Sequence, residues 1–470
     1  SPLAAHDTAS DRATLERDVR ILADDDMEGR EAGTRGYAAA AGDVAGRYAS
    51  IGLEPGGDNG TYFQTLTLRT VRDARAPELT LTIDGEDVQA EAYVDFYGGG
   101  TVLHEEGEVE AELVFVGYGL QLPEYGRDDF AGVDLKGKIA VRAFGAPSYL
   151  NNEELAHLRS TIADRVSAQG AIGMILVWTP ALDRLISFDM AAQTASTTSV
   201  MTWERPTGEG YSSAPNLKVR SSLSPSLSRR LMDSTQFTYD ALVAAEQTPG
   251  AQMPSFAMNA KARISFTNAI ERFADNNVIG ILPGTDPALA DQYVVLTGHL
   301  DHIGMQVAEG DGEDDTFNGA MDNASGIAAL LEVARMMEHN PPRRPLLFVA
   351  LAAEEVGLLG SAFHANYPGL RDGASLAVNV NLDMPILTYR FEDVNAFGAE
   401  RSNIYPYVEA AVEEMGLALT PDPNPEQGLF VRSDQYSYIQ TGVPAIYLKT
   451  GTNGAGAEGQ AAFLARHYHQ

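Results

Sequence analysis

The sequence contains no cysteine among its 470 residues. This absence excludes disulfide bonds, thiolate zinc sites and cysteine nucleophiles. Long apolar runs are missing as well, since the best candidates, AIGMILVW and LLFVALAA, are far shorter than the roughly 18 to 20 residues of a membrane helix. We therefore expect no membrane-spanning segment and no membrane partner.

Basic residues are scarce relative to acidic ones. The chain has 33 Lys and Arg against 65 Asp and Glu, which gives a formal net charge of -32. Such a surface repels nucleic acid and anionic lipid and keeps the protein solvated. Nucleic acid is therefore excluded as a partner. The sequence does not indicate the oligomeric state.

The first residues, SPLAAHDTAS, also lack the basic and apolar regions of a signal peptide. We expect a secreted or periplasmic protein whose signal peptide has been removed.

Length predicts two domains, because 470 residues are too many for one ordinary core, and a hydrophobic content of 44% is typical of a globular protein. Residues 105–250 are rich in strand patterns and poor in metal-binding side chains, so we predict a β-rich insert there. Residues 1–104 and 251–470 would then form one discontinuous domain. Trp178 and Trp203 lie in the insert, where core packing is their expected role.

Further elements are predicted from the spacing of apolar residues. They are strands at 61–83, a helix at 152–169, a loop followed by a helix at 221–247, a helix at 403–417 and a strand at 442–451.

The segment 293–383 contains three short apolar runs, each typical of a buried strand and each followed by side chains that bind metal ions. These side chains are His299 with Asp301, Glu354 with Glu355, and Asp383. Asp322 opens a helix between the first two runs. Because the carboxyl ends of parallel strands form the crevice where ligands bind, these residues predict a shared metal cluster.

Each of these residues has a simpler interpretation when it is taken alone. An aspartate before a helix, such as Asp322, is usually an N-cap, and adjacent glutamates usually lie in a solvated loop. His302, His339 and His364 are assigned to the structural histidines, and the acidic run 309–315 to a solvated loop. The glutamate pair, however, ends an apolar strand, where charge is expensive to bury without a cation.

The residues taken together fit a two-metal hydrolase. Such an enzyme needs one bridging carboxylate, two further ligands for each ion and a free general base. The ligands would be His299, Asp322, Glu355, Asp383 and a late histidine, which leaves Glu354 as the base. Oxygen and imidazole ligands without thiolate suit zinc, with cobalt or manganese as substitutes. No HExxH motif supports a single-zinc alternative.

The motifs GHLDH, GAMDNASG, AAEEVGLLGS, NLDM and a final YH resemble the co-catalytic zinc aminopeptidases of peptidase family M28, in the bacterial group with a protease-associated insert. MEGREAGTRG, GLEPGGDNGTYFQ, GYGL, DLKGK and SDQYSYIQTGVPAIYL extend this resemblance over nearly the whole chain. The resemblance implies an α/β fold, with a mixed, mainly parallel central sheet flanked by helices and a β-rich inserted domain.

The resemblance also implies a role for each residue. His299 and Asp383 would bind one zinc ion, Glu355 and a C-terminal histidine the other, and Asp322 would bridge the two. Glu354 would be the general base, and Asp301 would orient the ring of His299.

The family's aromatic-histidine pair selects His469 as the last ligand and leaves His467 as a neighbour. Related chains continue beyond this histidine, so we expect either further residues after Gln470 or a site completed near a free chain end. By the same resemblance, Arg432, Ser433 and Asp434 would lie close to the substrate pocket.

The activity implied is hydrolysis of the N-terminal residue from peptides with a free N-terminus, by water activated between two zinc ions. Three alternatives stay open. A carboxypeptidase of the same superfamily would need a basic pocket, and a glutaminyl-cyclase-like acyltransferase usually has one zinc ion. A non-catalytic peptide-binding relative would be expected to have lost ligands.

Overall fold

The computed structural model describes residues 8–147, 149–248, 250–306 and 315–469. Residues 309–314 of the predicted acidic loop therefore lie outside the described residues. The chain forms two compact units, one of residues Ser1–Thr67 and Phe273–Gln470 and the other of Leu68–Arg272. No helix of the described residues is long and apolar enough to cross a membrane.

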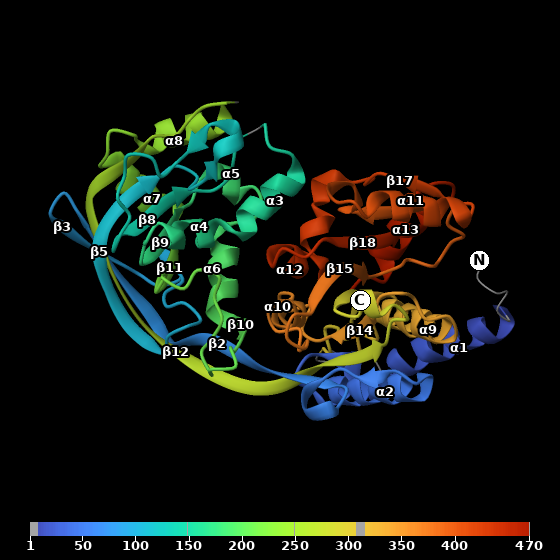
Figure 1. The fold of residues 1–470 in the computed structure, drawn as a ribbon. Coiled ribbons are helices and arrows are strands. Elements are labelled where there is room, and N and C mark those ends of the chain that lie inside the picture. The colour runs from blue at the N-terminus through green and yellow to red at the C-terminus, as the bar shows by residue number, and fades with distance from the viewer. Residues whose placement is uncertain (1–7, 148, 249, 307–314, 470) are drawn as a thin grey trace. The chain divides into compact units, whose positions relative to one another are not determined.

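The first unit is built on a mixed sheet whose centre is parallel (Figure 1). In spatial order its strands are β17 (Ala418–Thr420), β16 (Asp393–Phe397), β18 (Ala445–Thr450), β15 (Ser375–Leu382), β13 (Gln292–His299), β14 (Leu346–Leu351) and the end of β12 (Ser255–Leu282). Strands β18, β15, β13 and β14 run parallel to one another, whereas β12 is antiparallel to β14 and β16 to β18. All six residues of β14 are buried, as its uninterrupted apolar sequence predicts for a central strand.

Helices cover both faces of this sheet. On one face α2 (Arg35–Ile51) brings Tyr48 against Gly280 of β12, and α9 (Ser325–His339) brings Ile327 close to Gly298 of β13. On the other face α10 (Leu359–Asn366) and α12 (Gln435–Gln440) pack Ala365 and Tyr438 against alternate residues of β13 and β14. The predicted fold class, a mainly parallel sheet flanked by helices, is thus confirmed for this unit. Its remaining helices are α1 (Thr8–Leu22), α11 (Tyr405–Glu414) and α13 (Gly456–Arg466).

The second unit has its own sheet and core. The first part of β12 pairs with β5 (Glu106–Val116), followed in space by β8 (Ile139–Ala143), β9 (Gly173–Val177), β11 (Val219–Leu223) and β4 (Phe96–Tyr97). Strands β5, β8, β9 and β11 are parallel. Its other elements include β2 (Phe63–Ile83), β3 (Glu86–Ala90), β10 (Val200–Trp203), α3 (Asn152–Ser160), α4 (Ile162–Ala168), α6 (Phe188–Thr197), α7 (Pro225–Asp233) and α8 (Tyr239–Gln247).

The second unit is longer at both ends than the insert predicted at 105–250. The reason is that β2 and β12 are long strands that carry the chain between the two units. Most of β2 and the first part of β12 group with the second unit, so residues 68–104 and 251–272 belong to it.

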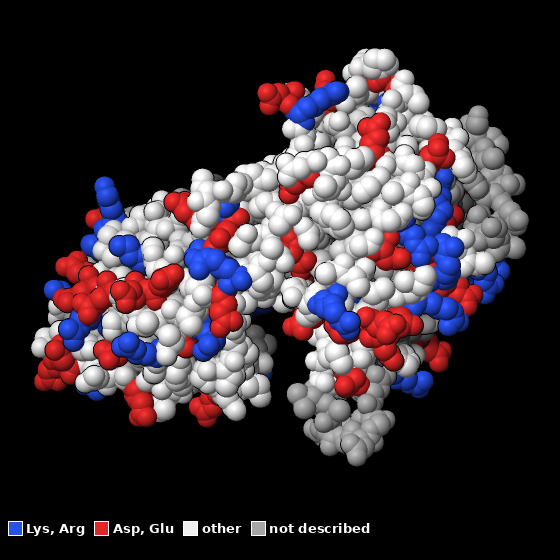
Figure 2. All heavy atoms as spheres, turned by 90° about the horizontal axis from the view of Figure 1, so that it is seen from below, with Lys and Arg blue, Asp and Glu red and all other residues white. Residues whose placement is uncertain are grey.

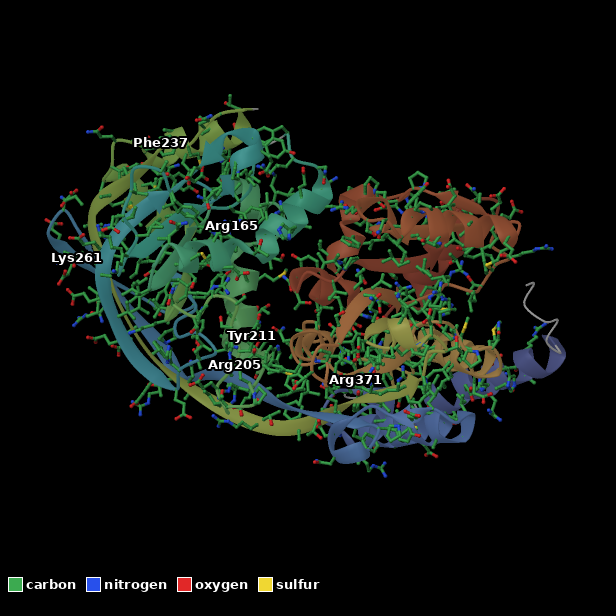
Figure 3. The ribbon with its side chains drawn as sticks, viewed as in Figure 1. Arg165, Arg205, Tyr211, Phe237, Lys261 and Arg371 are labelled. Carbon is green, nitrogen blue, oxygen red and sulfur yellow. The ribbon has the colours of Figure 1, made fainter. Side chains whose placement is uncertain are left out.

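Both tryptophans of the second unit are buried side chains that pack against other aromatic rings. Trp178 packs edge-on against Phe188. Trp203 stacks on Tyr211, and the guanidinium of Arg205 lies over the Tyr211 ring (Figure 3). The expected packing role fits this placement, and neither tryptophan lies among the candidate metal ligands.

One predicted element is wrong. Residues 221–247 were expected to form a loop and a helix, but the structure has the end of β11 followed by two helices, α7 and α8. The Ser224 hydroxyl accepts a hydrogen bond from the amide of Leu227, and Pro225 occupies the first turn of α7. Ser-Pro is here a helix start and not a loop signal. The predicted helices at 152–169 and 403–417 and the strand at 442–451 are confirmed in their main parts by α3 with α4, α11 and β18.

Candidate metal centre

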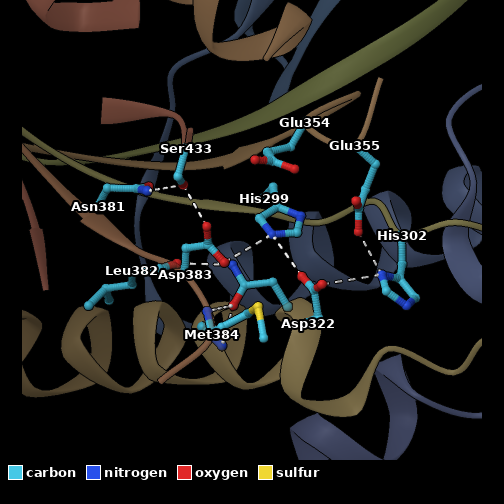
Figure 4. Close-up of polar contacts among 12 residues, drawn as sticks. His299, His302, Asp322, Glu354, Glu355, Asn381, Leu382, Asp383, Met384 and Ser433 are labelled. Atoms are coloured by element: carbon cyan, nitrogen blue, oxygen red, sulfur yellow. Dashed lines mark hydrogen bonds and ion pairs between the residues drawn. The ribbon is translucent and has the colours of Figure 1, made fainter. Parts of the chain in front are cut away.

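Four of the candidate residues lie at the carboxyl ends of three adjacent parallel strands (Figure 4). His299 is the last residue of β13, Glu354 and Glu355 follow β14, and Asp383 follows β15 directly. Parallel pairing places these strand ends at one edge of the sheet, and His299 is directly opposite Leu351 in the β13–β14 register. Asp322 comes from the irregular turn Ala320–Ala324 before α9, and His469 follows α13.

Three buried side chains form the first group of ligand atoms. Nε2 of His299 lies 3.2 Å from Oδ1 of Asp322 and 3.3 Å from Oδ1 of Asp383. The ligand atoms of this group all lie within 4.8 Å of one another. This spacing suits coordination of a single ion.

The second group uses the other oxygen of Asp322. Its Oδ2 lies 3.2 Å from Nε2 of His469, and that nitrogen lies 3.6 Å from Oε2 of Glu355. His302 belongs to the same group, since its Nδ1 lies 2.8 Å from Oε1 of Glu355 and 4.0 Å from Oδ2 of Asp322. The two carboxylate oxygens of Asp322 thus face different groups, Oδ1 the first and Oδ2 the second.

His302 was assigned to the structural histidines, and the structure instead places its ring nitrogen among the candidate ligands. The signal in the sequence was its position one residue after Asp301, within GHLDH. His364 fits the structural class better, because it is fully buried on α10 and its Nδ1 lies 2.7 Å from the Tyr438 hydroxyl. Burial lowers the pKa of His364 to about 4.

Glu354 lies beside the first group, where His299, Glu354 and Glu355 also bring ligand atoms together. Burial raises the pKa of Glu354 well above its usual value, and the charges of Asp383, Asp434 and Asp301 raise it further. His299 opposes this shift. A carboxyl group in this position is suited to holding a proton during a reaction.

Asp301 holds the backbone of the glutamate pair. Its carboxylate accepts hydrogen bonds from the amides of Glu354 at 3.1 Å and Glu355 at 3.2 Å. The ring Nδ1 of His299 is 3.1 Å from the main-chain oxygen of Asp301 but 3.9 Å from its carboxylate. The nearer group to the His299 ring is therefore the carbonyl, whereas the sequence prediction gave that role to the acid.

Ser433 and its neighbours support Asp383. The hydroxyl of Ser433 donates to Oδ2 of Asp383 at 2.6 Å, and the amide group of Asn381 donates to Ser433 at 2.9 Å. Asp434 is fully buried, and burial raises its pKa to about 6. Arg432 lies beside Ser433 and is exposed.

Arg30 is a buried residue that the sequence analysis did not select, although it lies within MEGREAGTRG. Its guanidinium donates to the carbonyls of Leu300 at 2.8 Å, Asn318 at 2.7 Å and Gly319 at 2.9 Å, and also to that of Leu22. Burial lowers its pKa to about 10, while nearby acids, including Asp322, oppose the shift. The buried guanidinium of Arg30 thereby links, through hydrogen bonds, the segments that carry His299 and Asp322.

Comparison with known proteins agrees with this geometry. Residues 277–470 match the sequence model of peptidase family M28. This match agrees with the family that the motifs of the sequence resemble.

Among curated proteins, the chain is 28% identical to aminopeptidase YwaD of Bacillus subtilis, over 33% of this chain and 31% of that protein. It is 36% identical to a probable zinc metalloprotease of Pyricularia oryzae over 25% of this chain and 22% of that protein. It is 30% identical to aminopeptidase Y of Saccharomyces cerevisiae over 43% of this chain and 35% of that protein. The alignments thus span about a third or less of these relatives.

Among solved structures, an aminopeptidase from Aneurinibacillus sp. strain AM-1 aligns over 93% of this chain and 85% of its own, with a TM-score of 0.44 and 20% identity.

Proposed function

We propose that this protein is a zinc-dependent aminopeptidase that removes the N-terminal residue from peptides by hydrolysis. The observation that carries the proposal is the position of Asp322, whose two oxygens each lie 3.2 Å from a histidine nitrogen, one of His299 and one of His469. A carboxylate shared by two ligand groups is the central requirement of a two-metal site. The relatives named aminopeptidase and zinc metalloprotease support the same class of reaction.

The chemistry of the donor groups fits zinc. They are imidazole and carboxylate groups without thiolate, and acids as buried as Asp322 and Asp383 are costly without a compensating cation. His299, Asp322 and Asp383 would hold one ion, and Asp322, Glu355 and His469 the other, with His302 beside Glu355. Cobalt or manganese would be substitutes. When bound, two such ions lower the pKa of a shared water molecule and polarise the peptide carbonyl.

Glu354 would act as the general base. Its carboxylate takes the proton of the attacking water and then delivers it to the leaving amine. Asp301 would act by positioning, because its two hydrogen bonds fix the backbone from which the Glu354 side chain projects. We further propose that the natural substrates are peptides outside the cytoplasm, in keeping with the expectation of a secreted or periplasmic protein.

Replacement of Glu354 with Gln tests the proposed base. The change preserves the size of the side chain but removes its basic oxygen, so we expect the metal content to be retained and kcat to fall by about 10² to 10⁴. Glu355→Gln is the matched control, which should weaken the binding of one ion. Turnover of aminoacyl reporter substrates and the zinc content are measured on the same preparations. Near-normal kcat in the Glu354→Gln protein would overturn this mechanism.

A substrate panel separates the proposed activity from its alternatives. The zinc-loaded protein is offered an aminoacyl reporter, the same reporter with a blocked amino group, and an N-blocked peptide with a free C-terminus. We expect turnover of the first only. Cleavage of the N-blocked peptide at its C-terminus would identify a carboxypeptidase instead.

A further inference from the structure

The second unit contains a cavity of about 490 Å³ that is separate from the residues of the metal centre. Its walls come from β2, β8, β9, β11 and the glycine-rich segment after β4. The sequence analysis assigned no chemistry to this unit. The charged residues that line the cavity are three arginines, Arg72, Arg142 and Arg220, and one acid, Asp73.

Two arginines, Arg142 on β8 and Arg220 on β11, line this cavity together. In the parallel register of the sheet, Arg142 is opposite Leu176 and Arg220 is opposite Met174, and both of these belong to β9. Met174 and Leu176 are two residues apart on one strand, so their side chains share a face of the sheet. Both arginine side chains therefore project from the same face of the sheet as Met174 and Leu176.

Neither arginine has an acidic partner within ion-pair distance among the residues that the structure describes. Arg142 donates one hydrogen bond, to the carbonyl of Ala143 at 2.8 Å, and its Nε is buried without a partner in the described structure. Arg142 is half-buried and Arg220 is exposed at the mouth of the cavity, whereas two buried arginines of this unit are paired. Nε of Arg69 lies 2.9 Å from Glu204, and Nε of Arg127 lies 2.8 Å from Asp129.

The electrostatics of the two groups agree with this geometry. Burial lowers the pKa of Arg142 to about 10, and the nearby charges of Arg220 and Arg159 contribute to this shift. Burial also lowers the pKa of Arg220, and the more distant charge of Asp164 opposes that shift. Both groups remain charged near neutral pH, so the cavity concentrates positive charge and its unliganded state carries a repulsive cost.

The rest of the lining combines apolar side chains with polar ones such as Asp73, Ser212 and Asn268. Val71, Met174, Leu176, Val200 and Leu217 all line the cavity. A small inorganic anion would contact the guanidinium groups but leave this apolar wall in water. A ligand with an anionic head and an apolar body would cover both.

We propose that this cavity binds a small amphiphilic carboxylate, such as the C-terminus of a short peptide with an apolar last side chain. Arg142 and Arg220 hold the carboxylate, and Met174, Leu176 and Leu217 contact the apolar group. A planar guanidinium matches a carboxylate with two parallel hydrogen bonds, which accounts for arginine in place of lysine at both positions. The inference does not rest on the metal centre.

Titration calorimetry of the full-length, zinc-loaded protein with N-acetyl-leucyl-leucine tests the ligand class. The acetyl group blocks hydrolysis by the proposed aminopeptidase. We expect the acid to bind and its C-terminal amide to bind about tenfold more weakly or worse, because the amide lacks the charge. Octanoate that matched the acid would support the cavity and assign it to non-peptide carboxylates. Equal binding of acid and amide, or binding of inorganic phosphate as tight as that of the acid, would overturn the proposal.

Variants locate the site. Arg142→Gln and Arg220→Gln should each weaken binding of the acid by about tenfold or more, and Arg220→Lys should weaken it less, since it keeps the charge. Arg229→Gln is the control, because Arg229 pairs with Asp240 on the surface of the same unit. Unchanged affinity in both Gln variants would overturn the proposal, and would be the result if the acid bound at the metal centre.

A measurement without ligand separates binding from a structural role. If the two arginines exist to bind an anion, Arg220→Gln removes repulsion, so the unfolding temperature of the unliganded protein should stay the same or rise. Turnover of the aminoacyl reporter should not change. A lower unfolding temperature in Arg220→Gln, as expected for a guanidinium that supports the fold, would count against the proposed role.

Discussion

At the scale of single residues, Asp322 decides whether the candidate metal centre has one site or two. Its Oδ1 faces His299 and its Oδ2 faces His469. Asp322→Ala should therefore lose both ions together, whereas Asp383→Ala should lose one. Metal analysis of dialysed variants measures this. One full equivalent retained by Asp322→Ala would contradict a shared carboxylate.

Glu246 on α8 provides a pH-dependent prediction in the second unit. Burial raises its pKa to about 7, although the Thr179 hydroxyl donates to its Oε1 at 3.0 Å. The folded protein therefore binds more protons than the unfolded chain between the ordinary glutamate pKa and pH 7, and its free energy of unfolding falls as pH rises through that window. Glu246→Gln removes the titrating carboxyl group and with it this pH-dependent fall in the free energy of unfolding.

We expect Glu246→Gln to be more stable than the parent by about 1 to 2 kcal/mol near pH 8 and equal to it near pH 4, after allowance for partial solvent exposure. Urea unfolding at several pH values measures the difference. Glu209→Gln, at an exposed position of the same unit, is the control. A Glu246→Gln difference that did not depend on pH would show that the carboxyl group does not titrate in the folded state as described.

The residues expected at the candidate metal centre follow from local sequence patterns, whereas their contacts with one another do not. The positions of His299, Asp322 and Asp383 follow from strand ends and a helix start, which local patterns reveal. The contact of His302 with Glu355 and the carbonyl partners of Arg30 depend on segments far apart in the chain. No local pattern encodes such contacts.

At the scale of elements, the packing of α10 against the end of β14 controls the position of the glutamate pair. A Cβ on Gly360 would lie 2.2 Å from the carbonyl oxygen of Ala352 and 2.6 Å from Oδ1 of Asn277. Glu354 is two residues beyond Ala352. Gly360→Ala should therefore displace the end of β14, destabilise the protein by about 1 to 3 kcal/mol and lower kcat.

Gly42→Ala is the matched control for this change. Gly42 is also a helical glycine of the first unit, but no atom lies within 4 Å of the position that a Cβ would take there. That variant should gain about 0.5 to 1 kcal/mol from helix propensity and keep its activity. Thermal unfolding and reporter turnover of both variants check the pair. Equal effects of the two substitutions would show that the contact with Ala352 is unimportant.

Elements were predicted well where periodicity is strong and poorly where two signals compete. β14 and α11 were evident from their apolar spacing. The start of α7 was missed because serine and proline favour loops as well as helix N-termini, and only the hydrogen bond to Leu227 distinguishes the two. The extent of the second unit was underestimated because β2 and β12 continue through the boundaries without a break in pattern.

At the scale of the whole molecule, the surface and the metal centre distribute negative charge differently. Figure 2 shows acidic and basic side chains interspersed on the face viewed from below. The acids of the metal centre, by contrast, include the buried Asp301, Asp322 and Asp383. Without a cation these like charges repel one another in a region of low polarity.

Removal of metal by a chelator should consequently lower the unfolding temperature of the first unit by several degrees and leave that of the second unit unchanged. Calorimetry combined with hydrogen exchange assigns each transition to its unit. Added zinc should restore the first transition. A shift confined to the second unit would argue against a metal centre in the first.

The candidate ligands are spread along the chain from His299 to His469 and meet only in the folded sheet. If these residues bind ions as proposed, metal capture is a late event on the folding pathway, since loops of this length must close before a complete coordination sphere exists. A partly folded chain offers at most scattered, weak ligands. Metal retention would then report correct folding, because only molecules with the right strand order, helix starts and final histidine position would hold the ion.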